Sequence, residues 1–183
     1  MRKPYYFTIS SLPYLLFYKD LPISKNDFFA ISAIELDPKD LLILRSVRLF
    51  NTMPEIVPLY VLRKWYKWEM GLRNAFVKQR SARLGLNKKE YLKGDDYSIS
   101  SVHFQIVEEA FKTDSPFEAE EMIDKARWRF LDELEFDYCF GLEKLVIYYL
   151  RLQILDRRSS FNAEKGIERL DAVLSQVEGV WGH

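Results

Sequence analysis

Histidine and cysteine, two side chains that often act as nucleophiles, bases or metal ligands, are few in this sequence of 183 residues. His103 and His183 are the only histidines, and their separation does not indicate a catalytic triad. His103 lies in the apolar run SVHFQIVEEAF, which favours a packed or surface histidine over a general base. The single cysteine, Cys139, lies among aromatic and acidic residues in FDYCFGLEK, so we expect a buried structural cysteine rather than a reactive thiol.

The acidic residues do not form a convincing catalytic pattern either. Glu120–Glu121 and Glu133/Glu135 are pairs of a kind common on solvated helix faces. Metal-ligand spacing is absent from the sequence, and so is a glycine-rich phosphate loop. We therefore expect a protein that is not an enzyme, with no metal, no cofactor and no small-molecule substrate.

Composition indicates a globular protein with an ordinary balance of residues. Hydrophobic residues make up 48% of the chain, charged residues 30%, and the formal net charge is zero. A single cysteine excludes an internal disulfide and fits a reducing compartment. The basic, apolar N-terminus is interrupted by Pro13, Lys19 and Asp20, unlike a secretory signal, and no window has the length of a membrane span. These features predict a cytoplasmic protein.

Helix signals dominate the chain and predict an all-α fold. Asp37–Pro38 is typical of a cap followed by a first helical residue, and Ser24, Thr52, Ser115 and Asn162 also precede periodic segments. Only YYFTIS alternates like a strand, and one strand cannot form a sheet. The expected helices span residues 25–33, 38–50, 54–84, 99–112, 116–136, 140–157 and 163–177.

We expect the helices to form one bundle, with two helical halves as the other arrangement. The polar segment KGDDYSISS, residues 93–101, is the best boundary, between an N-terminal half at 1–92 and a C-terminal half at 102–183. Helix 54–84 is long for a small domain, and Pro58 and Gly71 could bend or split it. Gly85 stands where a left-handed C-cap is expected.

Charge is distributed unevenly between the halves. Residues 63–83 contain seven basic residues and one acid, Glu69, whereas residues 108–143 are strongly acidic. The two patches could pair with each other, or each could face a partner. If the basic edge faces a partner, the residues expected to bind it are Arg63, Lys67, Lys78, Arg80 and Arg83.

Glu69 is unexpected because it lies on the apolar stripe of its helix. Leu62, Trp65, Leu72, Ala75 and Phe76 recur at helical spacing and define that stripe. Arg73 follows Glu69 by four residues, the favourable order for a helical ion pair. One interpretation is a partly buried Glu69–Arg73 pair that ties this helix to a neighbour. The other interpretation is that the basic edge beyond this pair docks an acidic partner.

Basic and aromatic residues also alternate in RKWYKW and RNAFVKQR, as they do in helices that bind nucleic acid. The neutral total and the acidic half oppose that function. We expect no nucleic acid partner, although a nucleic-acid-binding helical protein and a stand-alone helical adaptor remain the alternatives.

The N-terminal segment resembles a bacterial family encoded with V/A-type ATPase subunits. The match consists of paired tyrosines, Ser-Leu-Pro and a proline-serine entry into the first helix: Tyr5, Tyr6, Ser11, Leu12, Pro13, Pro22 and Ser24. A second resemblance is to the C-type subunit of A-type ATPases, which corresponds to the d-type subunit of eukaryotic V-ATPases. It involves the segment from Phe136 to Val177 and the residues Glu69, Leu72, Arg73, Asn74, Lys78 and Gly85.

This resemblance implies a function in coupling rather than in chemistry. The C-type subunit is an all-helical socket between the central rotor stalk and the membrane proteolipid ring, and this chain is much shorter. The implied protein is a non-catalytic accessory or central-stalk component that docks on V/A-type ATPase subunits. It would reach the cytoplasmic face of the membrane through those partners. A homo-oligomer is also compatible with the sequence.

Overall fold

The chain folds entirely as helices in the part that the computed structural model describes, which is residues 3–50, 59–85, 92 and 99–160. These residues form seven helices and no strand, which confirms the all-α prediction. The helices are α1 (Tyr6–Ser11), α2 (Lys25–Glu35), α3 (Pro38–Ser46), α4 (Tyr60–Leu84), α5 (Ser101–Lys112), α6 (Pro116–Glu135) and α7 (Leu142–Ser160).

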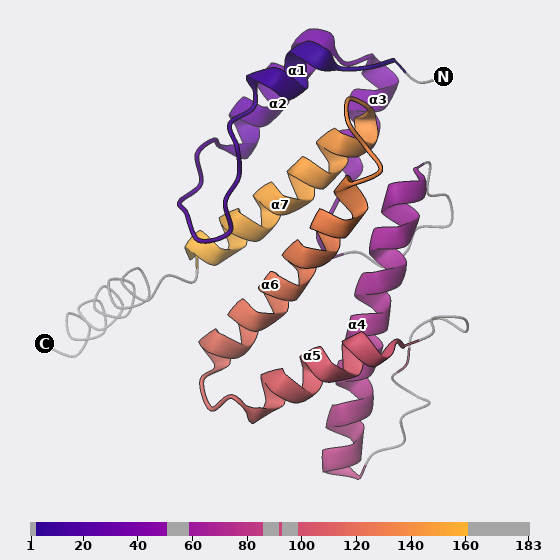
Figure 1. Ribbon diagram of the computed structural model, residues 1–183, viewed down its shortest axis with the longest axis vertical. Helices are drawn as coiled ribbons and strands as arrows, with labels where there is room; N and C mark the ends of the chain where they lie inside the picture. The colour runs from indigo at the N-terminus through magenta and orange to yellow at the C-terminus, as the bar shows by residue number, and fades with distance from the viewer. Residues whose placement is uncertain (1–2, 51–58, 86–91, 93–98, 161–183) are drawn as a thin grey trace, which may run out of the picture.

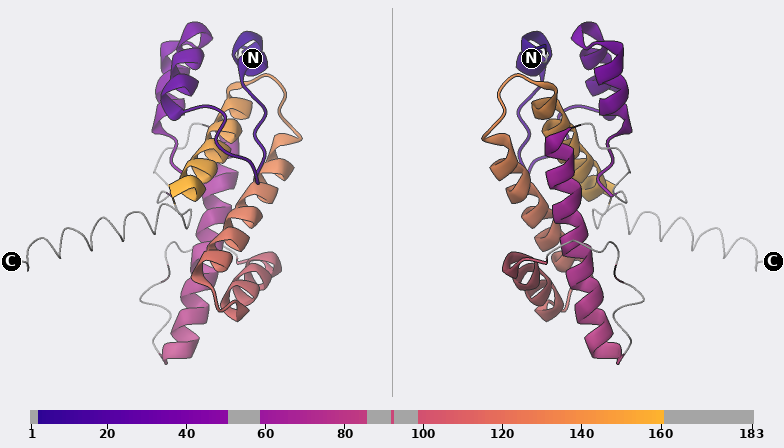
Figure 2. Two further views of the ribbon diagram at one scale, coloured as in Figure 1. Left: turned by 90° about the vertical axis from the view of Figure 1, so that its left-hand side faces the viewer. Right: turned by 90° about the vertical axis from the view of Figure 1, so that its right-hand side faces the viewer.

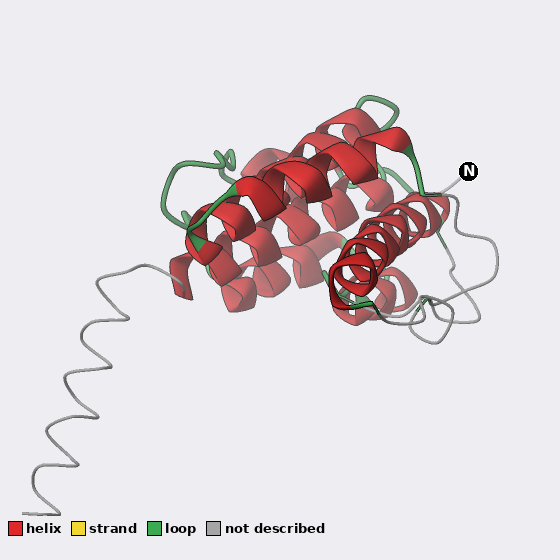
Figure 3. Ribbon diagram, turned by 90° about the horizontal axis from the view of Figure 1, so that it is seen from below, coloured by secondary structure: helices red, strands yellow, loops and turns green. Residues whose placement is uncertain are grey.

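Three long helices, α4, α6 and α7, form the body of the bundle (Figure 1). At one end of the bundle, α5 packs against both α4 and α6. At the other end, α3 packs on α7, and α1 and α2 complete that layer (Figure 2). Seen along its length, the molecule is a bundle of helices with loops at its margins (Figure 3).

Several caps lie where the sequence places them. The hydroxyl of Ser24 accepts a hydrogen bond from the amide of Asp27, and that of Ser115 accepts one from Glu118. Gly85 ends α4 with φ of 66°, the left-handed conformation that glycine adopts without cost. Asp37 occupies the N-cap position of α3 without a side-chain cap bond.

The strand-like YYFTIS segment, residues 5–10, is helical instead: Tyr5 is the N-cap of helix α1, which spans Tyr6–Ser11. Tertiary contacts fix the segment: the amide of Tyr5 donates to the carbonyl of Phe140, and its buried hydroxyl donates to Asp40 at 2.6 Å. The amide and hydroxyl of Thr8 both donate to Glu35 at 2.9 Å. Six residues are too few for periodicity to distinguish a strand from a helix that neighbours hold in place.

Helix α3 ends at Ser46, earlier than the predicted residue 50. The chain leaves the helix with Val47 in an extended conformation, and Val47 and Leu49 are both buried in the core. The amide of Leu49 then donates to Gln153 on α7 at 3.0 Å. Residues two apart point to opposite sides of a helix, so the extended backbone at Val47 lets both side chains enter the core, against the local helix propensity.

Helix α4 is continuous from Tyr60 to Leu84, about 37 Å at roughly 1.5 Å per residue. Gly71 lies inside it without splitting it. Pro58 and the predicted cap at Thr52 lie outside the described residues, as does the predicted helix at 163–177 with its cap at Asn162.

The main hydrophobic cluster draws side chains from both predicted halves. It joins Phe28, Leu44 and Trp65 from the N-terminal side of the 93–101 segment with Leu131 and Leu150 from the C-terminal side. A smaller cluster lies where α4, α5 and α6 meet and contains Leu72, Ala75, Val107 and Ile123. Both clusters hold α4 against α6, and this packing positions the charged site described next.

Candidate functional site: the charged side chains of α4

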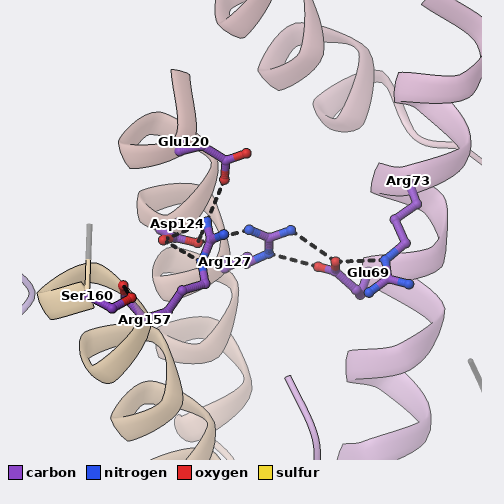
Figure 4. Close-up of polar contacts among 7 residues, drawn as sticks. All are labelled: Glu69, Arg73, Glu120, Asp124, Arg127, Arg157 and Ser160. Carbon is purple, nitrogen blue, oxygen red and sulfur yellow. Dashed lines mark hydrogen bonds and ion pairs between the residues drawn. The ribbon is translucent and has the colours of Figure 1, made fainter. Parts of the chain in front are cut away.

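Glu69 is the centre of a buried ion network between α4 and α6 (Figure 4). Its side chain is only 1% exposed, and both carboxylate oxygens accept hydrogen bonds from Arg127, each at 3.0 Å. Arg73 adds a third bond from its Nε to Oε1 at 3.2 Å. Arg127 thus forms the bidentate arrangement that makes guanidinium–carboxylate pairs strong and directional.

The network continues from Arg127 to the third long helix. Arg127 also donates to Asp124 on its own helix at 2.9 Å, and Asp124 accepts bonds from Arg157 of α7. Arg157 reaches Glu120 as well, so a chain of alternating charges joins α4, α6 and α7 (Figure 4). Each buried charge has partners of opposite sign, which is the condition for burying such groups.

Burial alone would lower the pKa of Arg127, but the charges of Glu69 and Asp124 raise it above its ordinary value. The guanidinium therefore stays charged inside the bundle. The ring of Phe50 covers this region, with the guanidinium carbons of Arg73, Arg127 and Arg157 5.5, 4.8 and 5.3 Å from its centroid. Phe50 thus makes cation–π contacts with three arginines of the network.

The sequence identified the Glu69–Arg73 pair of this network and missed Arg127, which makes the contact between α4 and α6. The predicted Glu69–Arg73 pair is present, but the residue that ties α4 to its neighbour is Arg127. Its signal lay in the spacing of α6, where Ile123, Arg127 and Leu131 follow at intervals of four and lie on one buried face. A basic residue on a buried face of one helix is the expected complement of an acid on the buried face of another.

His103 is packed in the interior, one of the two alternatives favoured for it. Its ring lies against Gly71 and 5.3 Å from the ring of Trp68, centroid to centroid. Its Nδ1 accepts the amide of Ser100 at 3.1 Å, so the imidazole serves as the second member of a capping box at the start of α5. His183 lies outside the described residues.

Cys139 is exposed, which makes the prediction of a buried cysteine wrong. It lies in the connection between α6 and α7, where Phe136 is also 92% exposed. The aromatic neighbours that suggested burial belong to a turn and not to a buried helix face.

His103 should make stability depend on pH. Burial lowers the pKa of His103 more than the charge of Glu69 and the carbonyl of Trp68 raise it. The contribution of His103 to stability is therefore fully present above its unfolded pKa of about 6.5. It is lost as the pH falls toward the lower folded pKa, because between the two values only the unfolded chain takes up the proton. We expect a lower urea midpoint at about pH 5.5 than at about pH 7.5.

The variant His103→Gln is the control for this pH dependence. Glutamine keeps an acceptor for the Ser100 amide, as in an ordinary capping box, and does not titrate. Its urea midpoint should change less between the two pH values than that of the native chain. An equal change in both proteins would contradict the assignment to His103.

The five residues predicted to bind a partner do not share one face of α4. At about 100° per residue, Arg63, Lys67 and Lys78 lie within about 60° of one another, whereas Arg80 and Arg83 project from a different side. All except the half-buried Lys78 are exposed. Lys78 lies over the ring of Phe104, and Arg83 lies 4.4 Å from the ring centroid of Phe111, both on α5.

The described residues contain no group of three or more histidine, cysteine, aspartate or glutamate side chains that could hold a metal ion. In the same part of the chain, every helix is too short or too polar to cross a bilayer. The geometry on α4 consists of a buried ion network that holds α4 against α6, with exposed cations on either side of it.

Fold and site together define an all-helical protein with a charged helix at its surface. A family model described as "Protein of unknown function (DUF2764)" matches residues 45–178, well over half of the chain. The chain belongs to this family. No curated protein and no solved structure matches it.

Proposed function

We propose that this protein is a non-catalytic accessory or central-stalk component of a bacterial V/A-type ATPase, which docks on its partner through the basic residues of α4. The observation that carries the proposal is the pairing of charges within the bundle. Of the seven basic residues on α4, only Arg73 forms an ion pair with another described residue. The other six form no ion pair with an acidic residue in that part of the structure.

The acidic helix α6 does not neutralise these cations. Its acids pair mainly with basic residues of α7: Glu120 and Asp124 with Arg157, Glu121 with Arg158, and Asp132 and Glu135 with Arg151. Among the described residues, the ion pair that joins the basic helix to α6 is Glu69 with Arg127, in which α4 supplies the acid. Of the two uses that the sequence left open for the basic patch, docking on a partner is therefore the better supported.

The choice of a V/A-type ATPase rests on the sequence resemblance and on nothing in the described geometry. Tyr5 and Ser24, two residues of the N-terminal resemblance, have definite structural roles in positioning α1 and starting α2. Glu69 and Arg73, from the resemblance to the C-type subunit, lie together in the buried network. These residues support a shared helical scaffold, and the docking surface beside them supports a component that works by contact.

Charge reversal on α4 tests the proposal. In a pull-down of the ATPase from the native host, the double variants Arg63→Glu/Lys67→Glu and Arg80→Glu/Arg83→Glu each reverse two exposed charges, one pair on each side of the helix. We expect at least one pair to reduce capture about tenfold at low salt. Capture by the native chain should itself weaken as salt is raised, because exposed charges are screened.

The matched control is Lys19→Glu/Lys39→Glu, which reverses two exposed charges away from α4. It should capture the complex as the native chain does, and all three variants should melt normally, since exposed substitutions usually cost little. If the native chain fails to capture the ATPase, or if both α4 pairs behave like the control, the proposal fails.

A further inference from the structure

Two basic residues of α4, Arg73 and Arg80, meet at a cleft beside the ion network. The cleft has a volume of about 290 Å³ and is lined by Arg73, Arg80, Arg127, Glu120, Phe76 and Ile123, among others. Arg73 and Arg80 are seven residues apart, so they lie on the same side of α4 about two turns from each other. Arg127 approaches from α6. Three guanidinium groups and one carboxylate therefore border the same space.

The three guanidinium groups differ in how much hydrogen-bonding capacity remains. Arg127 uses its Nε, Nη1 and Nη2 on Glu69 and Asp124, so it contributes a positive charge at a fixed position. Arg73 uses only its Nε, on Glu69, within the described contacts. Arg80 is exposed and makes no ion pair there, and its guanidinium lies 6.0 Å from the ring centroid of Phe76. Arg73 and Arg80 are thus the donors available to an incoming anion.

The single carboxylate of the cleft does not pair with Arg73 or Arg80 in the described contacts. Glu120 lies at the edge of the cleft and pairs with Arg157 of α7. Glu69 is beneath the surface and already accepts three hydrogen bonds from Arg127 and Arg73. The cleft therefore has more basic than acidic side chains, and Phe76 and Ile123 give it an apolar lining. An acidic side chain with its aliphatic stem matches both features, because guanidinium forks recognise carboxylates and the stem packs on apolar surface.

We propose that this cleft binds a carboxylate side chain from an acidic segment of a partner protein, with Arg80 and Arg73 as the donors. The proposal rests on the docking function above and refines it: it places the specific contact at Arg80 rather than along the basic surface as a whole. Arg83 provides the comparison, because it is exposed on the same helix yet does not line the cleft.

Binding of fluorescein-labelled hexaglutamate to the full chain, followed by fluorescence anisotropy, tests this site. Arg80→Glu should weaken binding at least tenfold, whereas Arg83→Glu, with the same change of charge, should weaken it less than about twofold. Arg80→Lys keeps the charge but loses the fork, and we expect an intermediate loss of about threefold. Unchanged melting temperatures would show that the variants fold.

Three results would overturn the site. Equal losses for Arg80→Glu and Arg83→Glu would mean that the overall positive charge of α4, and not a specific contact at Arg80, attracts the peptide. Displacement of the peptide by submillimolar inorganic phosphate would indicate a small-anion site instead. Absence of binding by the native chain at low salt would remove the site altogether. Failure here remains distinct from failure of docking: if Arg80→Glu still captures the ATPase while Arg63→Glu/Lys67→Glu does not, the docking function stands without the cleft.

Discussion

Replacing Glu69 by alanine should destabilise the protein by about 3–5 kcal/mol, because it leaves the buried Arg127 without its bidentate partner. Asp124 still contacts one nitrogen of Arg127, but the other two bonds are lost inside the bundle. Urea denaturation followed by circular dichroism would measure the loss as a lower midpoint with an unchanged slope. In a domain of this size it corresponds to a fall in melting temperature of roughly 10 °C.

Arg73→Ala is the matched control for this prediction. Arg73 donates to the same carboxylate oxygen as Arg127, but its side chain is 35% exposed, and its removal leaves Glu69 fully paired with Arg127. We expect a loss of less than about 1 kcal/mol, as for other ion pairs near solvent. Equal losses for the two variants would contradict the view that the α4–α6 contact, and not the pair within α4, bears on stability.

Removing both buried charges should cost much less than removing one. In Glu69→Leu/Arg127→Met the two side chains become apolar together. Asp124 keeps its bonds to Arg157, and Arg73, which loses Glu69, is 35% exposed, so no buried charge is left unpaired. The double variant should recover most of the stability that Glu69→Ala loses. If it is as unstable as the single variant, packing around Arg127 matters more than its charge.

Much of the fold could be predicted from the sequence because local signals agreed with the tertiary structure. Ser24, Ser115 and Gly85 mark helix ends through interactions within a few residues, and the apolar stripe with Trp65 and Leu72 is buried as its spacing indicates. Such features depend on neighbours along the chain. They are therefore visible without coordinates.

The errors arise where distant residues decide the structure. Tyr5 is fixed by Asp40 and Phe140, and α3 stops early because Val47 and Leu49 both enter the core. The same limit applies to the site. Glu69 and Arg73 are neighbours on one helix and could be paired from their spacing, but Arg127 meets them only after α4 and α6 pack together.

Gly71 shows how a residue expected to be a break point can instead be required by packing. A Cβ at this position would lie 2.6 Å from Cε1 and 2.9 Å from Nδ1 of His103, closer than real contacts of this kind. The ring cannot move away freely, because Nδ1 holds the Ser100 amide and the imidazole packs near Trp68. Gly71 therefore lets α5 approach α4 closely.

Gly71→Ala should consequently destabilise the protein by about 1–3 kcal/mol, the usual cost of overpacking. On an exposed helix the same change would gain up to about 1 kcal/mol, because alanine is the better helix former. The sign of the effect, measured as a shift in the urea midpoint, therefore separates a packing role from a purely local one.

His103→Ala completes the test of this contact. Alone it costs stability by leaving a cavity, but in Gly71→Ala/His103→Ala the new methyl group enters the vacated space. The double variant should be more stable than the sum of the single losses by about 1 kcal/mol or more, measured as urea midpoints in a double-mutant cycle. Additive losses, or a gain from Gly71→Ala alone, would show that the two helices do not depend on this contact.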